Sequence, residues 1–257
     1  MKRYRHLLIM VVPAIGLLAW GASRLAPVRA ADEPGKQPQT SEGKSDSKTN
    51  QASKFWTTAV PPKPLSASVK KGLDWLVEHQ LAGGGWGEGE ESLQMRQSGN
   101  DHESLRDKPN VADTCIAALA LLRSGSTPRE GLYRDAIAKA VRFVQSQVET
   151  SDGESLSVTP VRGTRVQQKL GPNIDTFLAS MLLAEVKDRM PDAKSDKAVE
   201  LALAKVVRKI ERHQKEDGSF DGQGWAPILA QAMCGKGINR ARQAGVSVPE
   251  IVLARAE

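Results

Sequence analysis

The chain has 257 residues, of which 40% are hydrophobic, 26% charged and only 4% aromatic. This length suits one domain with additional segments, and the apolar content excludes a wholly disordered chain. The formal net charge is +6, but residues 1–30 contain five basic and no acidic residues, so the rest of the chain carries only +1. Because the positive charge is concentrated in that segment, it does not indicate nucleic-acid binding, and we expect no nucleic-acid partner.

The first 30 residues have the organisation of a secretory signal peptide. Basic residues come first, a mostly apolar run of 14 residues follows at positions 7–20, and Val28-Arg29-Ala30 provides a site for cleavage. The run is short for a membrane helix, which needs about 20 apolar residues. We therefore predict a signal peptide over residues 1–30 and an exported protein, periplasmic or extracellular. An uncleaved N-terminal membrane anchor is the alternative, and it would place the protein at a membrane surface.

Residues 31–64 are expected to form a flexible linker. Up to residue 53 the segment consists mainly of Ser, Lys, Gln, Asp and Glu. Such a composition cannot bury enough apolar surface to offset the entropy that is lost on ordering. The folded domain is therefore predicted to cover residues 65–257.

From residue 65 onward the apolar residues follow a helical period. Val69, Leu73 and Leu76, for example, recur at steps of three and four and share one helix face. The first, third and fifth predicted helices are amphipathic, whereas the second and fourth are Ala- and Leu-rich and apolar nearly all round, which indicates burial on most sides. The fold class is therefore all-α. The predicted helices cover residues 65–81, 111–122, 132–148, 174–186, 198–213, 225–234 and 248–256.

Three glutamines mark a repeat, because each ends an amphipathic helix and successive copies are 67 residues apart. In the first and third copies a glycine follows four residues after the glutamine and an aromatic residue follows after six. The middle copy has no aromatic residue at that place. The repeat-motif residues are Gln80, Gly84 and Trp86, then Gln147, and then Gln214, Gly218 and Phe220.

The two apolar helices also begin alike, with Asp113-Thr114 in one and Asp175-Thr176 in the other. Asp and Thr at a helix start can bond free backbone N–H groups, and a negative charge suits the helix dipole there. These features predict a row of helical hairpins in which apolar helices form an inner layer and amphipathic helices an outer layer. Two long polar loops, residues 87–109 and 150–172, would join the layers. Neither loop contains a recognisable nucleophile–base pair, and we interpret both as a solvated rim.

The spacing of Gln80, Gly84 and Trp86 resembles the Gln-Trp repeat of squalene–hopene cyclases and of the related prenyltransferase/squalene oxidase repeats. The resemblance covers about residues 65–240. It implies an α/α-toroid-like array of about three and a half hairpins. Since a toroid of this kind usually has more hairpins, we expect an incomplete, open ring or a fragment of a longer toroid. Its open C-terminal end would then be available for self-association.

The same resemblance directs attention to Asp113 and Asp175 as candidate catalytic acids. Squalene–hopene cyclases protonate their substrate through an Asp-rich segment, and residues 110–115 have its frame. However, Ala112 stands where an acidic residue would be needed, and the chain has no Asp-Asp pair. We therefore expect both aspartates to be structural and the protein to be a non-catalytic module that binds a protein or an apolar ligand, without a cofactor. A cyclase-like or prenyltransferase-like enzyme, or a fragment of one, is the alternative.

Resemblance to the prenyltransferases also implies a zinc site made by an Asp, a Cys and a His. Asp113, Cys115 and His213 are the residues available. Side chains two positions apart on a helix point some 200° from each other, so we expect no metal site. Cys115 and the second cysteine, Cys234, both lie in apolar helical patterns. They are predicted to be separate buried thiols rather than a disulfide.

Overall fold

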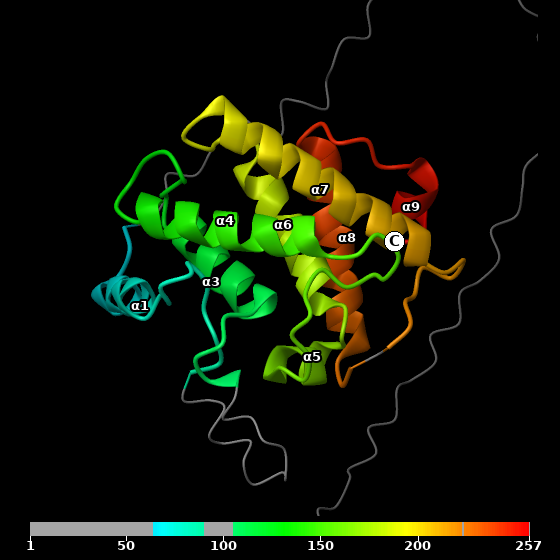
Figure 1. The fold of residues 1–257 in the computed structure, drawn as a ribbon, viewed down its shortest axis with the longest axis horizontal. Helices are drawn as coiled ribbons and strands as arrows, with labels where there is room; N and C mark the ends of the chain where they lie inside the picture. The colour runs from blue at the N-terminus through cyan, green and yellow to red at the C-terminus, as the bar shows by residue number, and fades with distance from the viewer. Residues whose placement is uncertain (1–63, 90–104, 223, 257) are drawn as a thin grey trace, which may run out of the picture. The chain divides into compact units, whose positions relative to one another are not determined.

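The computed structural model describes residues 64–89, 105–222 and 224–256. The predicted signal peptide, almost all of the predicted linker and much of the loop at 87–109 lie outside these residues. Within them the chain is all-helical, as predicted, and the only β pairing is an isolated bridge between Trp86 and Asn110 (Figure 1). The helices are α1 (Ala67–Glu78), α3 (Val111–Arg123), α4 (Arg134–Thr150), α5 (Arg165–Leu170), α6 (Ile174–Val186), α7 (Ala193–His213), α8 (Pro227–Gln243) and α9 (Glu250–Ala254).

The predicted helices all occur, with two differences. The sixth was predicted to end at residue 234, but α8 continues to Gln243. Gly235 and Gly237 weaken the helical pattern there, yet packing on α6 keeps the segment helical. The loop at 150–172 was predicted without structure but contains α5. This short helix begins with a capping box, in which Thr164 accepts from the backbone N–H of Gln167 while the side chain of Gln167 accepts from that of Thr164.

The helices α3, α6 and α8 pack side by side in that order, with α6 in the middle. In Figure 1, α1 and α3 lie on one side of α6, whereas α8 and α9 lie on its other side. The helix α4 packs on α3, and α7 packs on α6 and α4. Whereas Val69 on the stripe of α1 is 49% exposed, the amphipathic helices α4 and α7 bury apolar residues completely, with Ile137 and Val144 on α4 and Leu203 and Ile210 on α7. Each such side chain contributes about 1.5–3 kcal/mol, more than the ~1 kcal/mol of a typical hydrogen bond, so apolar packing dominates stability.

The helices α6 and α8 approach closely where small residues face each other. A Cβ added at Gly237 would lie 1.8 Å from Oγ of Ser180 and 3.1 Å from the carbonyl oxygen of Phe177. The Ser180 hydroxyl already donates to that carbonyl at 2.6 Å. Glycine at position 237 therefore sets the spacing between the two helices.

Basic side chains of α7 hold the loop that follows α4. Nζ of Lys209 donates to the carbonyl oxygens of Ser155 and Ser157 at 2.6 and 3.1 Å. Lys205, one turn earlier, donates to the carbonyls of residues 149 and 151. Lys209 is 3% exposed, and burial lowers the pKa of its ammonium group. Side-chain donors of α7 thus hold this loop in place. It lacks the glycine turn that follows Gln80 and Gln214.

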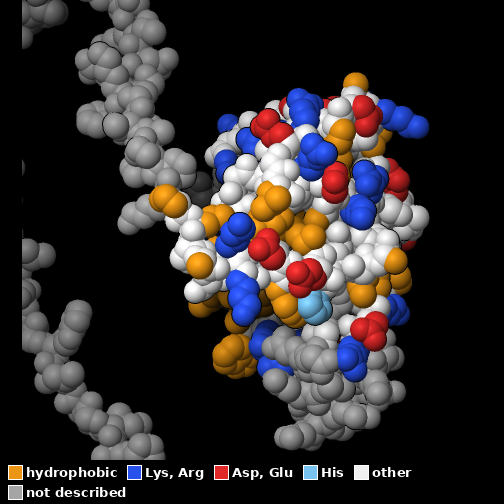
Figure 2. All heavy atoms as spheres, turned by 90° about the vertical axis from the view of Figure 1, so that its left-hand side faces the viewer, with side chains coloured by type: hydrophobic (Ala, Val, Ile, Leu, Met, Phe, Trp, Pro, Cys, Tyr) orange, Lys and Arg blue, Asp and Glu red, His pale blue; other side chains and the backbone are white. Residues whose placement is uncertain are grey.

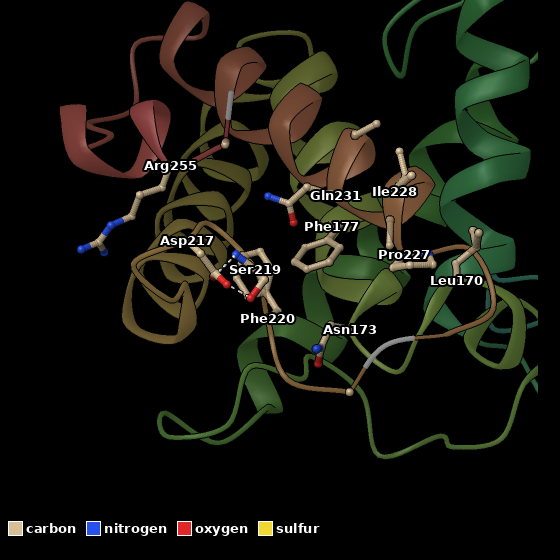
Figure 3. Close-up of a pocket in the computed structure, with 14 residues that line it drawn as sticks. Leu170, Asn173, Phe177, Asp217, Ser219, Phe220, Pro227, Ile228, Gln231 and Arg255 are labelled. Atoms are coloured by element: carbon tan, nitrogen blue, oxygen red, sulfur yellow. Dashed lines mark hydrogen bonds between the residues drawn. The ribbon is translucent and has the colours of Figure 1, made fainter.

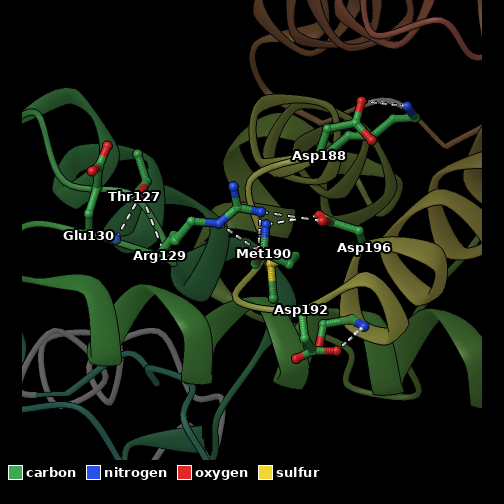
Figure 4. Close-up of polar contacts among 9 residues, drawn as sticks. Thr127, Arg129, Glu130, Asp188, Met190, Asp192 and Asp196 are labelled. Atoms are coloured by element: carbon green, nitrogen blue, oxygen red, sulfur yellow. Dashed lines mark hydrogen bonds and ion pairs between the residues drawn. The ribbon is translucent and has the colours of Figure 1, made fainter.

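At the opposite end of the helices, a polar clamp joins the loops after α3 and α6 (Figure 4). The guanidinium of Arg129 donates twice to the carbonyl oxygen of Met190, at 2.7 and 3.1 Å, and lies 3.7 Å from the carboxylate of Asp196. That carboxylate also accepts from the backbone N–H of Met190 at 2.9 Å. The clamp fixes the turn between α6 and α7, in which Asp188 adopts a positive φ of 63°.

Candidate ligand-binding site

The turns after Gln80 and Gln214 have the same backbone hydrogen bonds. The N–H of Leu81 donates to the carbonyl of Gly85 at 3.0 Å, and that of Gly84 donates to Leu81 at 2.8 Å. In the third copy the corresponding bonds measure 2.9 and 3.0 Å. Gly84 and Gly218 both have positive φ, 87° and 78°. The two copies of the sequence motif therefore form one kind of turn.

Each of these turns closely approaches a backbone carbonyl of a segment that follows later in the chain. A Cβ at Gly84 would lie 2.7 Å from the carbonyl oxygen of Lys139 in α4. A Cβ at Gly218 would overlap the carbonyl oxygen of Arg255, the residue directly after α9. Both glycines are required for this close approach as well as for their φ.

The three repeat glutamines make different contacts. Nε2 of Gln80 donates to the carbonyls of Gly84 and Ala136, at 2.8 and 2.9 Å, and so ties its turn to α4. Oε1 of Gln147 accepts from the hydroxyl of Thr159 at 3.5 Å. In the third copy Gln231 of α8 donates to the glycine carbonyl at 2.8 Å, and the side chain of Gln214, a residue 6% exposed, has no hydrogen-bond partner in the described part of the chain.

The two motif aromatics are buried in different ways. Trp86 donates its indole N–H to the carbonyl of Leu76 at 2.8 Å, and its backbone N–H donates to Oγ1 of Thr114 at 3.0 Å. This aromatic ring therefore covers the end of α1. Phe220 packs on Phe177 of α6 instead, with ring centroids 4.9 Å apart. The third copy therefore contributes its aromatic ring to the space between α6 and α8.

A cavity of about 590 Å³ lies at this place, between the N-terminal ends of α6 and α8 and the third turn (Figure 3). The rings of Phe177 and Phe220 lie at its base, and apolar side chains surround them. The lining residue Ile228 is 86% exposed, and Trp225, three residues earlier in the chain, is 84% exposed. A cavity of this size is typical of small-molecule sites. The apolar lining residues are Leu170, Phe177, Phe220, Pro227, Ile228, Ala230, Ala232 and Ala256.

The polar groups of this cavity are largely engaged. Gln231 donates to the turn, and Oδ1 of Asp217 accepts from the backbone N–H and the hydroxyl of Ser219, at 2.9 and 2.7 Å. The side chain of Asn173 donates to the carbonyl of Asp221 at 2.7 Å. The arrangement therefore favours an apolar ligand held mainly by ring and aliphatic contacts.

A second hollow, of about 780 Å³, runs along α1 and α3 and is lined by Asp113, Trp75 and Ile116. It lies on the α1 side of the molecule, the side that faces the viewer in Figure 2, where hydrophobic side chains emerge between charged ones. Oδ2 of Asp113 accepts from the side-chain amide of Asn110 at 2.6 Å. The cap of α3 is Asn110, whose Oδ1 accepts from the backbone N–H of Asp113 at 2.9 Å, so the carboxylate orients the cap instead of forming it.

Asp175 is 1% exposed and joins three helices. Its Oδ1 accepts from the backbone N–H of Ala112 in the first turn of α3 at 3.0 Å, and its Oδ2 accepts from Nε2 of Gln167 in α5 at 2.7 Å. Asp175 thus satisfies a free N–H of the neighbouring helix. Burial raises the pKa of its carboxyl group, although the bonds from Gln167 and Ala112 lower it in part. Asp175 lines neither cavity.

This raised pKa predicts how stability depends on pH. The folded protein binds the Asp175 proton more readily than the unfolded chain does. The stabilising contribution of this proton to the free energy of unfolding is therefore fully present below the ordinary pKa of 3.8, and it is lost as the pH rises through the pKa of Asp175 in the folded protein. We expect the free energy of unfolding of the Asp175→Asn variant to increase relative to wild type as the pH is raised from 4 to 7. Urea unfolding of both proteins across this range measures the difference, and a difference that stays constant contradicts the prediction.

The cysteines are free and fully buried, as predicted. Burial raises the pKa of Cys234 to about 12, and burial followed by the charge of Asp175 raises that of Cys115. Since only the thiolate reacts, about one Cys234 thiol in 10⁴ would be reactive at pH 8. We expect no reaction of the native protein with Ellman's reagent over minutes and the release of two thiols in guanidinium. Rapid reaction of either cysteine before unfolding would contradict the buried assignment.

Within the described residues, no group of three or more His, Cys, Asp or Glu side chains is placed to hold a metal ion. His213 bonds through Nδ1 to the carbonyl of Lys209 at 2.8 Å. The helices of this part of the chain are also too short or too polar to cross a membrane. None of the known protein-family models matches the chain, and no solved structure matches it.

The sequence interpretation did not identify the residues of the cavity at α6 and α8. Phe177 and Phe220 are two of only four phenylalanines, and one of them was recognised only as a motif residue. Their pairing across 43 positions has no local signal. Ile228 was assigned to a predicted helix, but its exposure depends on what packs beside α8.

Proposed function

We propose that this protein is a non-catalytic binding module built on α/α-toroid repeats of the cyclase and prenyltransferase kind. The turns at Gly84 and Gly218 have the same backbone hydrogen bonds, and each closely approaches a backbone carbonyl of a later segment, which supports the repeat assignment. A row formed by α3, α6 and α8, with the amphipathic helices α4 and α7 packed on α3 and α6, fits the stacking of such repeats. The ring would be open, as the sequence predicts.

The ligand would be apolar, and the cavity between α6 and α8 would bind it. The observation that carries this proposal is the pair of aromatic rings, Phe177 and Phe220, in a cavity whose lining residue Ile228 is almost fully exposed, as is Trp225 three residues earlier in the chain. Exposing such large side chains together is unfavourable for a protein without a ligand or partner. An apolar small molecule or an apolar side chain of a partner protein would cover them.

A neutral fluorescent probe, N-phenyl-1-naphthylamine, tests this site. We expect its emission to increase on binding to the wild-type chain, and we expect Ile228→Ser to weaken binding at least threefold. The matched control is Leu201→Ser, which removes another exposed apolar side chain, 58% exposed on α7, that is not a lining residue of the cavity. Equal loss in both variants, or no binding by wild type, would refute the cavity as the site.

A cyclase-like enzyme is the second candidate, because Asp113 faces a hollow with apolar walls that include Trp75 and Ile116. In this reading Asp113 would protonate a polyprene substrate. Incubation with squalene or a prenyl diphosphate, followed by product analysis, tests it. Turnover by wild type that Asp113→Asn abolishes would establish the enzyme over the binding module.

We also propose that the protein is exported, on the basis of residues 1–30. N-terminal sequencing of the protein from its native cell fraction tests this. A mature chain that starts at Ala31 is the expected result, and an intact N-terminus in the membrane fraction would favour the anchor.

A further inference from the structure

A third hollow, of about 590 Å³, lies at the opposite end of α6 from the aromatic cavity. It is formed by the last turns of α3, α6 and α8, which run parallel to one another. Its apolar part consists of Leu119 and Leu122 of α3 and Met181 of α6, of which Leu119 and Met181 are 5% and 7% exposed. This surface would suit an aliphatic chain.

The rim of this hollow is strongly basic. Four cationic side chains surround it: Arg123, Arg189, Lys236 and Arg240. The only acidic lining residue is Glu185, which Arg240 binds at 2.7 Å. In the part of the chain that the structure describes, the side chains of the other three form no hydrogen bond or ion pair. Three unpaired cations from three separate elements thus face one space.

Basic residues at helix C-termini can simply balance the helix dipoles, which carry about half a negative charge at each end. Three helix ends then supply about one and a half negative charges. Glu185 neutralises Arg240, so the three other cations face only the negative charge of the three helix ends. Their positive charge exceeds it. The turn that carries Arg189 is also fixed by the clamp of Arg129 on Met190 (Figure 4). The cluster is therefore held together although its members repel one another.

We propose that this basic hollow binds an anionic amphiphile, with a phosphate or carboxylate head group between Arg123, Arg189 and Lys236 and an alkyl chain on Leu119, Leu122 and Met181. Guanidinium groups bind such oxygens in a bidentate manner, and these charge-assisted bonds are stronger than neutral ones. The apolar part distinguishes this ligand from inorganic phosphate. The site is independent of the aromatic cavity, because the two share no lining residue.

Dodecyl phosphate, dodecyl maltoside and inorganic phosphate are the probes that test the site, and isothermal calorimetry on the full chain measures binding. We expect dodecyl phosphate to bind at least tenfold more tightly than the other two. The double variant Arg123→Glu/Lys236→Glu should lose at least tenfold in affinity. The matched control is Arg142→Glu/Arg208→Glu, which reverses two exposed arginines of α4 and α7 and should bind as wild type does.

Vesicles of phosphatidylglycerol, compared with vesicles of phosphatidylcholine, distinguish a membrane source of the head group from a soluble amphiphile. Residues 1–30 are basic and attract anionic vesicles in every variant, so the comparison is between variants that share them. If only the Arg123→Glu/Lys236→Glu chain sediments less with phosphatidylglycerol vesicles, the site binds a lipid. If all variants sediment equally but only this double variant loses affinity for dodecyl phosphate, the site binds a free amphiphile. Equal affinity for inorganic phosphate, no binding of dodecyl phosphate, or equal loss in the control variant would overturn the proposal.

Discussion

Replacing Gly84 by Ala is expected to destabilise the protein by about 2–4 kcal/mol, one of the largest effects of a single methyl group in this fold. The residue has a φ of 87°, where an L-residue other than glycine is strained by about 1–2 kcal/mol. The added Cβ would also lie 2.7 Å from the carbonyl oxygen of Lys139, a backbone atom in α4 that cannot rotate away. The turn would separate from α4, and Gln80 would lose its bond to Ala136. Chemical denaturation monitored by circular dichroism measures the change.

Gly125→Ala is the matched control, because Gly125 also has a positive φ, 98°, but its added Cβ would meet nothing within 4 Å. Gly125→Ala should lower the free energy of unfolding only by the backbone strain. The difference between its effect and that of Gly84→Ala then measures the contact of the turn with α4. If the repeat is structural, Gly218→Ala should destabilise by an amount similar to Gly84→Ala, because its added Cβ would also collide with a backbone carbonyl oxygen, that of Arg255. Equal effects of Gly84→Ala and Gly125→Ala would contradict the role of the contact.

Replacing Gly237 by Ala is expected to destabilise the protein by about 1–3 kcal/mol, although alanine is the better helix former. The added Cβ would lie 1.8 Å from Oγ of Ser180, and moving that hydroxyl breaks its bond to the carbonyl of Phe177. The helices α6 and α8 would then have to move apart along the most extensive helix pair of the fold. Urea unfolding of the purified variant gives the free-energy difference.

Gly235→Ala, two residues earlier on the same helix, provides the comparison. Its added Cβ would meet its nearest atom, the carbonyl oxygen of Ala256, at 3.5 Å, an ordinary contact. We expect it to be neutral or stabilising by up to about 1 kcal/mol, as helix propensity alone dictates. The double variant Gly237→Ala/Ser180→Ala should recover part of the stability, because the closest contact is removed. A neutral Gly237→Ala, or no coupling to Ser180, would show that the helices are less closely packed.

The local and periodic features of the chain could be predicted from the sequence, because they depend on neighbouring residues. Apolar steps of three and four residues gave the helices, since helix geometry converts this spacing into one buried face. The 67-residue spacing of Gln80, Gln147 and Gln214 located the turns, and the glycines at 84 and 218 have the positive φ that such turns need. The short helix α5 was missed because it is stabilised by the capping box of Thr164 and Gln167 more than by an apolar stripe.

The roles of individual polar residues could not be predicted, because they depend on contacts between distant segments. Asp113 and Asp175 begin their helices in the same way, yet one orients a cap beside an open hollow and the other is buried against Ala112 and Gln167. Likewise Gln80 and Gln214 share a motif, but Gln231 replaces Gln214 at the glycine carbonyl. A pattern of residue types cannot distinguish these outcomes, since each depends on which donor lies within hydrogen-bond distance of an acceptor in the folded structure.

By itself the sequence determined that the protein is helical, where its amphipathic helices lie and where its glycine turns occur, because hydrophobic periodicity and backbone φ are properties of short segments. Only the tertiary structure decided which side chains meet. Phe177 and Phe220 form the base of a cavity because the turn after α7 packs on α6. Arg123, Arg189 and Lys236 share a basic hollow because the packing of α3, α6 and α8 brings together the C-terminal parts of helices that are about 50–60 residues apart in the chain.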